Sequence, residues 1–108
     1  MDKEEKAKVL VELGGIDEGI YDSLVAEHLN QTKDRCLEIR KFLDENDIEQ
    51  VADLAHSVKG SSGNLRLQRL YEAAQELEAA AKSGDASTSL SLLLDTLEKE
   101  NNICIGTE

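Results

Sequence analysis

The stretch 48–58, IEQVADLAHSV, decides the fold of this 108-residue chain. Apolar residues recur in it at the i, i+3, i+4, i+7 spacing of a helix that packs one face against a core. They are Ile48, Val51, Ala52, Ala55 and Val58. Asp47 precedes the stretch and Gln50 follows it by three residues, which is the pattern of a capping box. We therefore expect a helix to begin after Asp47, whereas Gly60 and Gly63 leave its end open.

The same periodicity predicts four more helices around this stretch. Upstream, we expect a short helix over about 3–13, ended by Gly14-Gly15, and a long one from an Asp17 cap to about residue 46. Downstream, a helix over about 67–82 should be closed by Ser83-Gly84. Asp85 should cap the fifth helix, and the tail 102–108 shows no periodicity.

Composition agrees with an all-α fold. The chain has no proline and is rich in Leu, Ala, Glu and Lys, which favours long uninterrupted helices over sheet. Short connections make neighbouring helices antiparallel, so we expect an up-and-down four-helix bundle over 17–101. The short N-terminal helix should pack at one end of the bundle, and residues 1–108 should form a single domain.

Charge and hydropathy exclude several classes of partner. With 23 acidic and 12 basic residues the formal net charge is -11, which repels nucleic acid and acidic membranes. No apolar run approaches the roughly 20 residues of a membrane span, and the opening MDKEEKAK lacks the apolar core of a signal peptide, so we expect a cytoplasmic protein. Cys36 and Cys104 lack C-x-x-C spacing, so we expect inert thiols and neither a disulfide framework nor a zinc site.

The two histidines fall in different places on their helices. His28 lies in the middle of an apolar stripe that includes Ile20, Leu24 and Ile39, so we expect it to be buried and bonded to a polar neighbour. His56 lies at the edge of its stripe, so we expect it to be reachable from solvent.

The surroundings of His56 are small residues and one cation. If the helix continues, its neighbours are Ala52 at i-4, Lys59 at i+3, Gly60 at i+4 and Gly63 at i+7. A glycine inside a helix costs about 0.5–1 kcal/mol relative to alanine, and a bare surface lets a bulky group approach the imidazole. Lys59 would supply donors and positive charge to an anion such as a phosphoryl group. The residues alone leave open a second interpretation, in which Gly60 caps the helix, SSGN is a loop and His56 is an ordinary surface residue.

The segment AHSVKGSS, residues 55–62, resembles the signature of histidine-containing phosphotransfer (HPt) domains, A-H-x-L-K-G-[SA]-[SA]. Val58 stands where the family usually has leucine. Leu13-Gly14-Gly15, Asp47 and Leu77-Glu78 also resemble the layout of the family, so the resemblance extends over most of the chain.

The resemblance implies that His56 is the phosphoacceptor, that Lys59 stabilises the phosphoryl group and that Gly60 leaves room for a partner. We expect Gly63, Ser62 and Ala52 to complete the docking surface, with Ser61 and Ser62 as further hydroxyl donors.

The function implied by the family is that of a phosphorelay intermediate. It accepts a phosphoryl group from an aspartyl phosphate of a receiver domain and passes it to another receiver. The expected partners are receivers of response regulators or hybrid histidine kinases, which bring Mg²⁺. The chain has no G-x-x-x-x-G-K-[ST] loop, so we expect it not to bind ATP and not to be a kinase or other enzyme. It is expected to bind no cofactor of its own and, as a single domain of this size, to be a monomer.

Two alternatives accompany this hypothesis. One is a helical adaptor that docks signalling partners without relaying phosphate. The other is a bundle metal site, because Asp53 and His56 stand at i, i+3, but no E-x-x-H partner occurs and we expect no metal.

Arg66 departs from the family pattern, which commonly has glycine ten residues after the histidine. We expect the turn after the His56 helix to differ there or to depend on Gly63. Arg66 is then either a surface residue or an extra contact for phosphate or a partner.

Overall fold

The structure is a computed structural model that describes residues 2–106, and it has five α-helices and no strand within that range. In chain order these are α1 (Lys3–Glu12), α2 (Glu18–Asp44), α3 (Ile48–Asn64), α4 (Gln68–Lys82) and α5 (Ser87–Ile105). The prediction of an all-helical fold is confirmed.

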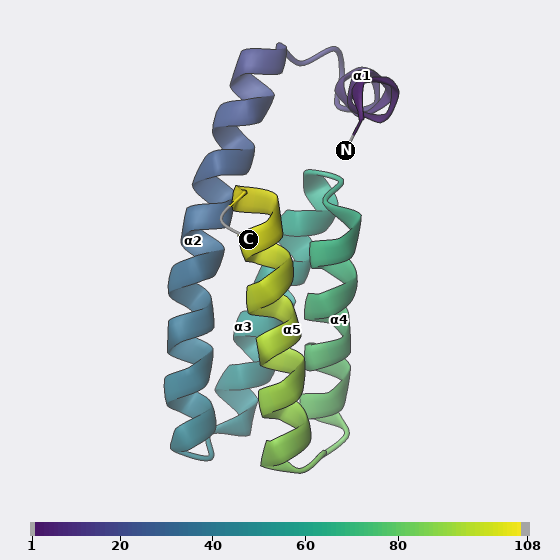
Figure 1. Cartoon of the computed structure of the whole chain (residues 1–108). Helices are drawn as coiled ribbons and strands as arrows, with labels where there is room; N and C mark the ends of the chain where they lie inside the picture. Colours follow the sequence, from purple (N-terminus) through teal and green to yellow (C-terminus); the bar gives the residue numbers. More distant parts are fainter. Residues whose placement is uncertain (1, 107–108) are drawn as a thin grey trace.

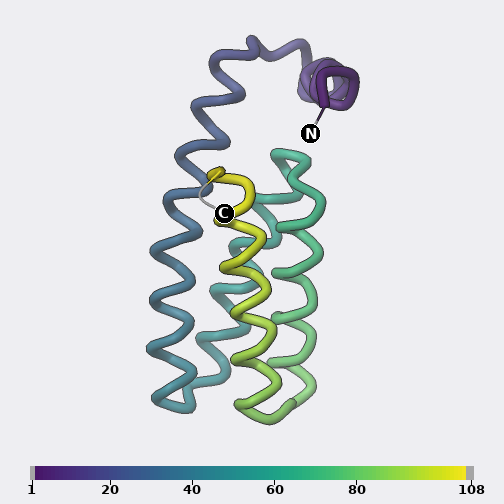
Figure 2. The backbone as a smooth tube through the Cα atoms, in the orientation of Figure 1, coloured from purple at the N-terminus to yellow at the C-terminus, as the bar shows by residue number. Residues whose placement is uncertain are grey.

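The four long helices lie side by side, and each runs opposite to its predecessor in the chain (Figure 1). They pack in a closed order, in which α2 contacts α3, α3 contacts α4, α4 contacts α5 and α5 contacts α2. α1 and the C-terminal end of α5 lie at the same end of the bundle (Figure 2). No helix within residues 2–106 is long and apolar enough to cross a membrane.

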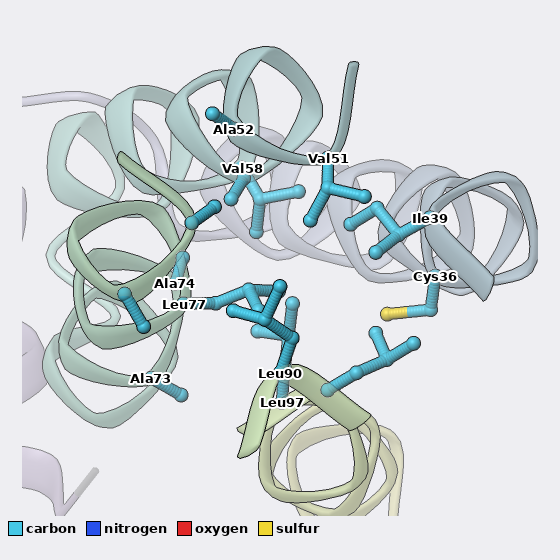
Figure 3. Packing of buried hydrophobic residues seen from close by; sticks show 14 of the residues in the cluster. Cys36, Ile39, Val51, Ala52, Val58, Ala73, Ala74, Leu77, Leu90 and Leu97 are labelled. Carbon is cyan, nitrogen blue, oxygen red and sulfur yellow. The ribbon is translucent and has the colours of Figure 1, made fainter. Parts of the chain in front are cut away.

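The core fills the space between these helices. Side chains such as Val58, Leu77, Leu90 and Leu97 point into it and are fully buried (Figure 3). Most of its residues come from α3, α4 and α5, because each of these helices buries the face on which its apolar residues recur. The sequence pattern therefore identified the buried faces of α3, α4 and α5.

The predicted stripe of α2 is wrong in its first turns. The side chains of Ile20 and Leu24 are exposed, with 56% and 42% of their surface accessible. The first turns of α2 extend beyond the other long helices (Figure 1), and Leu24 borders an open groove beside α3. Tyr21 is buried there instead, and its hydroxyl donates a hydrogen bond to the Leu65 carbonyl at 2.6 Å.

Two predicted N-caps are present and a third is absent. Asp17 and Asp47 accept hydrogen bonds from the third amide of α2 and α3, at 3.2 and 3.4 Å. The prediction for Asp85 is wrong, because its own amide closes the end of α4 on the Ala80 carbonyl and Ala86 is the N-cap residue of α5.

The end of α5 also differs from the expectation. The helix continues through Ile105 to a left-handed Gly106, so residues 102–105 belong to the helix and not to a tail. Residues 107–108 of the expected tail lie outside the described residues.

Arg66 occupies the position after α3 that suits glycine. Its φ is +62°, and the amides of Arg66 and Leu67 bond the carbonyls of Gly63 and Ser62, which is the hydrogen-bond pattern of a Schellman turn. The Arg66 guanidinium donates to the carbonyls of Gly63 and Asn64, at 3.0 and 3.3 Å. The expectation that the turn depends on Gly63 is wrong, because the backbone of Gly63 stays helical and Arg66 itself turns the chain.

Candidate functional site

α3 continues unbroken past both of its glycines to Asn64. The interpretation of Gly60 as a helix cap followed by a loop is therefore wrong. Because the helix is continuous, His56, Lys59 and Gly60 lie on neighbouring turns of one surface.

His56 combines an exposed ring with one fixed nitrogen. Its side chain is 65% exposed, and its Nδ1 lies 2.8 Å from Oε2 of Glu78 on α4. A carboxylate only accepts hydrogen bonds, so the partner nitrogen Nδ1 bears the proton. In the neutral ring this leaves the lone pair on Nε2, which makes Nε2 the nucleophilic nitrogen.

Glu78 is a buried carboxylate with three donors. Its side chain is only 5% exposed, and besides His56 it bonds Lys59 Nζ at 2.6 Å and Lys82 Nζ at 3.0 Å. Burial alone would raise the pKa of Glu78, but the hydrogen bonds from Lys59, Lys82 and His56 outweigh it and hold the pKa at about 2. Glu78 is therefore charged at neutral pH and orients the imidazole.

The two lysines give the site a local positive charge. The hydrogen bond to Glu78 raises the pKa of Lys59, so its ammonium stays protonated. Two ammonium groups around one carboxylate leave one net positive charge beside His56, in a chain whose formal charge is -11. This local field suits an anion that approaches the ring.

The two glycines of α3 have different surroundings. Gly60 is exposed, and a Cβ added there would meet nothing within 4 Å, so the surface beside His56 is bare. A Cβ on Gly63 would lie 3.2 Å from the Tyr71 ring, so this glycine faces α4 and makes room for helix packing. Gly60 is consequently open to a partner, whereas Gly63 serves the contact between helices.

Two residues of the expected docking surface are buried. Ala52 is 7% exposed and belongs to the core, and Ser62 is fully buried. The Ser62 hydroxyl lies 2.9 Å from Nε2 of His28, so it is used inside the bundle. The prediction that Ala52 and Ser62 contact a partner is wrong for this structure, because both face α3's packed side.

His28 lies inside the bundle, as its central place on the α2 stripe predicted. It is 4% exposed, bonds Ser62 and lies 3.5 Å from the Thr32 hydroxyl. Burial, with a smaller contribution from the Arg35 charge, lowers the pKa of His28. The prediction of a buried, hydrogen-bonded histidine is confirmed.

Sequence reasoning missed the role of Glu78 and overlooked Lys82. One signal was present: Glu78 follows Ala74 by four residues and thus lies on the apolar stripe of α4, where a charge needs a partner. Lys82 follows Glu78 by a further four residues, the spacing of a helical ion pair. The pattern on α4 could not show that the partner of Glu78 on the neighbouring helix α3 is His56.

The described residues give no indication of a metal centre. No group of three or more His, Cys, Asp or Glu side chains within residues 2–106 could hold a metal ion. Burial raises the pKa of the Cys36 thiol to about 12, and Cys104 is exposed. The arrangement at His56 instead fits transfer of a group to imidazole.

Residues 23–101 match the family model described as Hpt domain, and this range includes α3, α4 and His56. The chain belongs to the Hpt domain family. No significant match was found among curated proteins or among solved structures. Hpt domains carry phosphoryl groups on histidine in two-component phosphorelays, have no kinase activity and interact with receiver domains.

Proposed function

We propose that this chain is a phosphorelay intermediate built on an up-and-down four-helix bundle. His56 accepts a phosphoryl group from the aspartyl phosphate of one receiver domain and passes it to the aspartate of another. The observation that supports this function best is the bond from His56 Nδ1 to the buried carboxylate of Glu78. It leaves Nε2 as the attacking atom on an exposed ring beside Lys59.

The chemical step is an in-line displacement at phosphorus. The Nε2 lone pair forms the N–P bond, the P–O bond to the receiver aspartate breaks, and its electron pair stays on the aspartate carboxylate. The ring, which still holds its proton on Nδ1, gains a positive charge. Glu78 opposes that charge through a hydrogen bond that is in place before the reaction.

Positive charges on both this chain and the receiver stabilise the phosphoryl group. Lys59 and Lys82 offset the negative charge of Glu78, which would otherwise repel the incoming anion. Mg²⁺ is held by the receiver domain, and this chain supplies the nucleophile, the lysines and a docking surface. We place the exchange in the cytoplasm and expect the chain to act as a monomer without an ATP site.

The docking surface that we propose extends from Gly60 toward α2. An open groove between α2 and α3 is lined in part by Leu24, Ser61 and Asn64. Leu24 and Ile20 are exposed apolar residues one helical turn apart on α2. An apolar patch with a polar edge is typical of a protein interface, so we expect a receiver to cover Gly60 and Leu24 together.

The test is to mix the purified chain with Mg²⁺ and a receiver domain preloaded with phosphate, and to map the product by intact and peptide mass. We expect an acid-labile, base-stable adduct on His56 that a second, unphosphorylated receiver removes. An adduct on another residue would contradict the assignment of His56. No adduct with several different receivers would favour an adaptor that docks receivers without relaying phosphate.

A further inference from the structure

The carboxylate of Glu78 is shared unequally by its three donors. Lys59 bonds Oε1, whereas Lys82 and His56 Nδ1 both bond Oε2. The two lysines also differ in position, because Lys59 belongs to α3 with His56 and Lys82 belongs to α4 with Glu78. They are therefore two separate contacts to Glu78.

Phosphorylation makes a second demand on Lys59. A phosphoryl group on Nε2 lies on the side of the ring opposite the Nδ1–Glu78 bond, and Lys59 is the cation on His56's own helix that is suited to reach it. To do so, its ammonium must leave Oε1 of Glu78. A buried carboxylate that loses its cationic partner is destabilised, and Glu78 is 95% removed from solvent.

We propose that Lys82 is a positioning residue that holds Glu78 in place when Lys59 moves to the phosphoryl group. Lys82 bonds the same oxygen as His56 Nδ1, so the contact that orients the imidazole keeps its cation throughout the transfer. Lys59 is thereby free to exchange partners. This inference rests on the proposed relay function and specifies which cation keeps Glu78 against His56 during the transfer.

The proposal predicts that the two lysines are redundant at rest and not after phosphorylation. Without a phosphoryl group, either ammonium suffices to hold Glu78 against His56. Once Lys59 is drawn to the phosphoryl group, Lys82 is the only lysine that remains on the carboxylate, beside the Nδ1–H of His56. The proton on His56 Nδ1 reports this contact directly, because it gives a sharp ¹H–¹⁵N signal only while the hydrogen bond protects it from water.

The experiment compares full-length wild type, Lys82→Met, Lys82→Arg and Lys59→Met/Lys82→Met by ¹H–¹⁵N spectra of His56, before and after phosphorylation by a phosphorylated receiver. Lys82 is 65% exposed, so Lys82→Met should fold normally. Lys82→Met should keep the Nδ1 proton signal at rest and lose it after phosphorylation. Its phosphohistidine lifetime should shorten by about three-fold to ten-fold, the range expected for a partly exposed charged hydrogen bond. Lys82→Arg should restore both properties.

A matched control separates this role from a change of net charge. Lys99→Met removes an exposed lysine of α5 and should change neither the signal nor the lifetime. The proposal is overturned if phosphorylated Lys82→Met keeps the Nδ1 signal, or if Lys82→Met already loses it at rest. It is also overturned if the double variant keeps the signal at rest. The measurement on the double variant at rest needs no phosphate, so its result does not depend on the relay function. The relay function is tested separately, by whether any receiver phosphorylates the wild type.

Discussion

His28 and His56 are the same residue type on two helices that pack together, yet their surroundings are opposite. His28 is 4% exposed and bonds the neutral hydroxyl of Ser62. The His56 side chain is 65% exposed and bonds the charged carboxylate of Glu78. In His28, Nε2 is used by the fold, whereas in His56 the bond to Nδ1 leaves Nε2 free to react.

The difference shows which features of the bundle suit the proposed phosphoacceptor. Burial lowers the pKa of His28, which keeps its ring neutral, but burial also closes the ring to any donor. At His56 the buried partner is Glu78 and the ring stays outside. For the proposed transfer, the charged carboxylate of Glu78 and the bare surface at Gly60 therefore distinguish His56 from His28.

The largest expected effect is complete loss of phosphate uptake in His56→Gln. The nucleophilic nitrogen is removed, while the exposed side chain contributes little to packing, so the free energy of unfolding should change by less than about 1 kcal/mol. Receiver-dependent phosphorylation and thermal unfolding measure the two outcomes. Continued phosphorylation of this variant would show that another residue accepts the group.

Gly60→Gln should reduce transfer by about a hundred-fold, because its side chain enters the space that a receiver must occupy and such clashes cost a few kcal/mol. Stability should rise by about 0.5–1 kcal/mol, since glutamine favours helix more than glycine does. Gly60→Ala is the matched control: it should give a similar gain in stability with transfer close to wild type. Normal transfer by Gly60→Gln would refute the open surface beside His56.

Lys59→Ala should slow transfer by about ten-fold. The variant loses the charged hydrogen bonds of the Lys59 ammonium, each of about 1.5–3 kcal/mol, whereas Lys82 still bonds Glu78 and partly replaces the missing positive charge. Rapid-quench kinetics with a phosphorylated receiver measure this rate. Lys99→Ala on α5 serves as the control for net charge. Equal rates in Lys59→Ala and wild type would remove Lys59 from the mechanism.

His28→Leu should do the reverse of His56→Gln: it lowers the free energy of unfolding by about 1–3 kcal/mol, because Ser62 is left buried without its partner. The double variant His28→Leu/Ser62→Ala should recover part of that loss, since both polar groups are then absent. Urea unfolding measures both, and transfer per folded molecule should stay near wild type. A transfer defect as large as that of His56→Gln would mean that His28 belongs to the reaction.

The pH dependence sharpens the same comparison. Because the pKa of folded His28 is lowered from 6.5, the unfolded chain binds more protons below that pH. Stability from this residue is therefore full above pH 6.5 and declines as the pH falls toward the folded pKa, by at most about 1.4 kcal/mol per pH unit. Urea unfolding between pH 7.5 and 5.5 should show this slope in wild type and a smaller one in His28→Leu.

The smallest expected effect is at the turn after α3. Arg66→Gly should raise the free energy of unfolding by about 0.5 kcal/mol, because relief of the left-handed backbone slightly exceeds the added entropy of glycine in the unfolded chain. Asn46→Gly, at the equivalent turn after α2, should gain less because asparagine tolerates φ near +59°. A loss of stability in Arg66→Gly would show that the guanidinium bonds to Gly63 and Asn64 outweigh the strain.

The sequence was most informative where the physics is local. Periodic apolar residues predict the buried faces of α3, α4 and α5, and Asp17 and Asp47 mark two helix starts, because helical spacing and capping depend on residues within one or two turns. The same reasoning separated buried His28 from exposed His56. It failed at Ile20 and Leu24, because an apolar stripe is buried only where another helix lies against it.

By itself, therefore, the sequence determined most of the helices and the family, and it predicted which histidine is exposed. Only the tertiary structure decided how that histidine is held. The contact between Nδ1 and Glu78 joins residues 22 positions apart on different helices, and Lys82 meets them from α4. The tertiary structure also placed Ser62 inside the bundle with His28. Such contacts depend on which helices are neighbours and on how far each is shifted along the bundle axis. Helical periodicity specifies neither, because it gives only the direction in which a side chain points around the axis of its own helix.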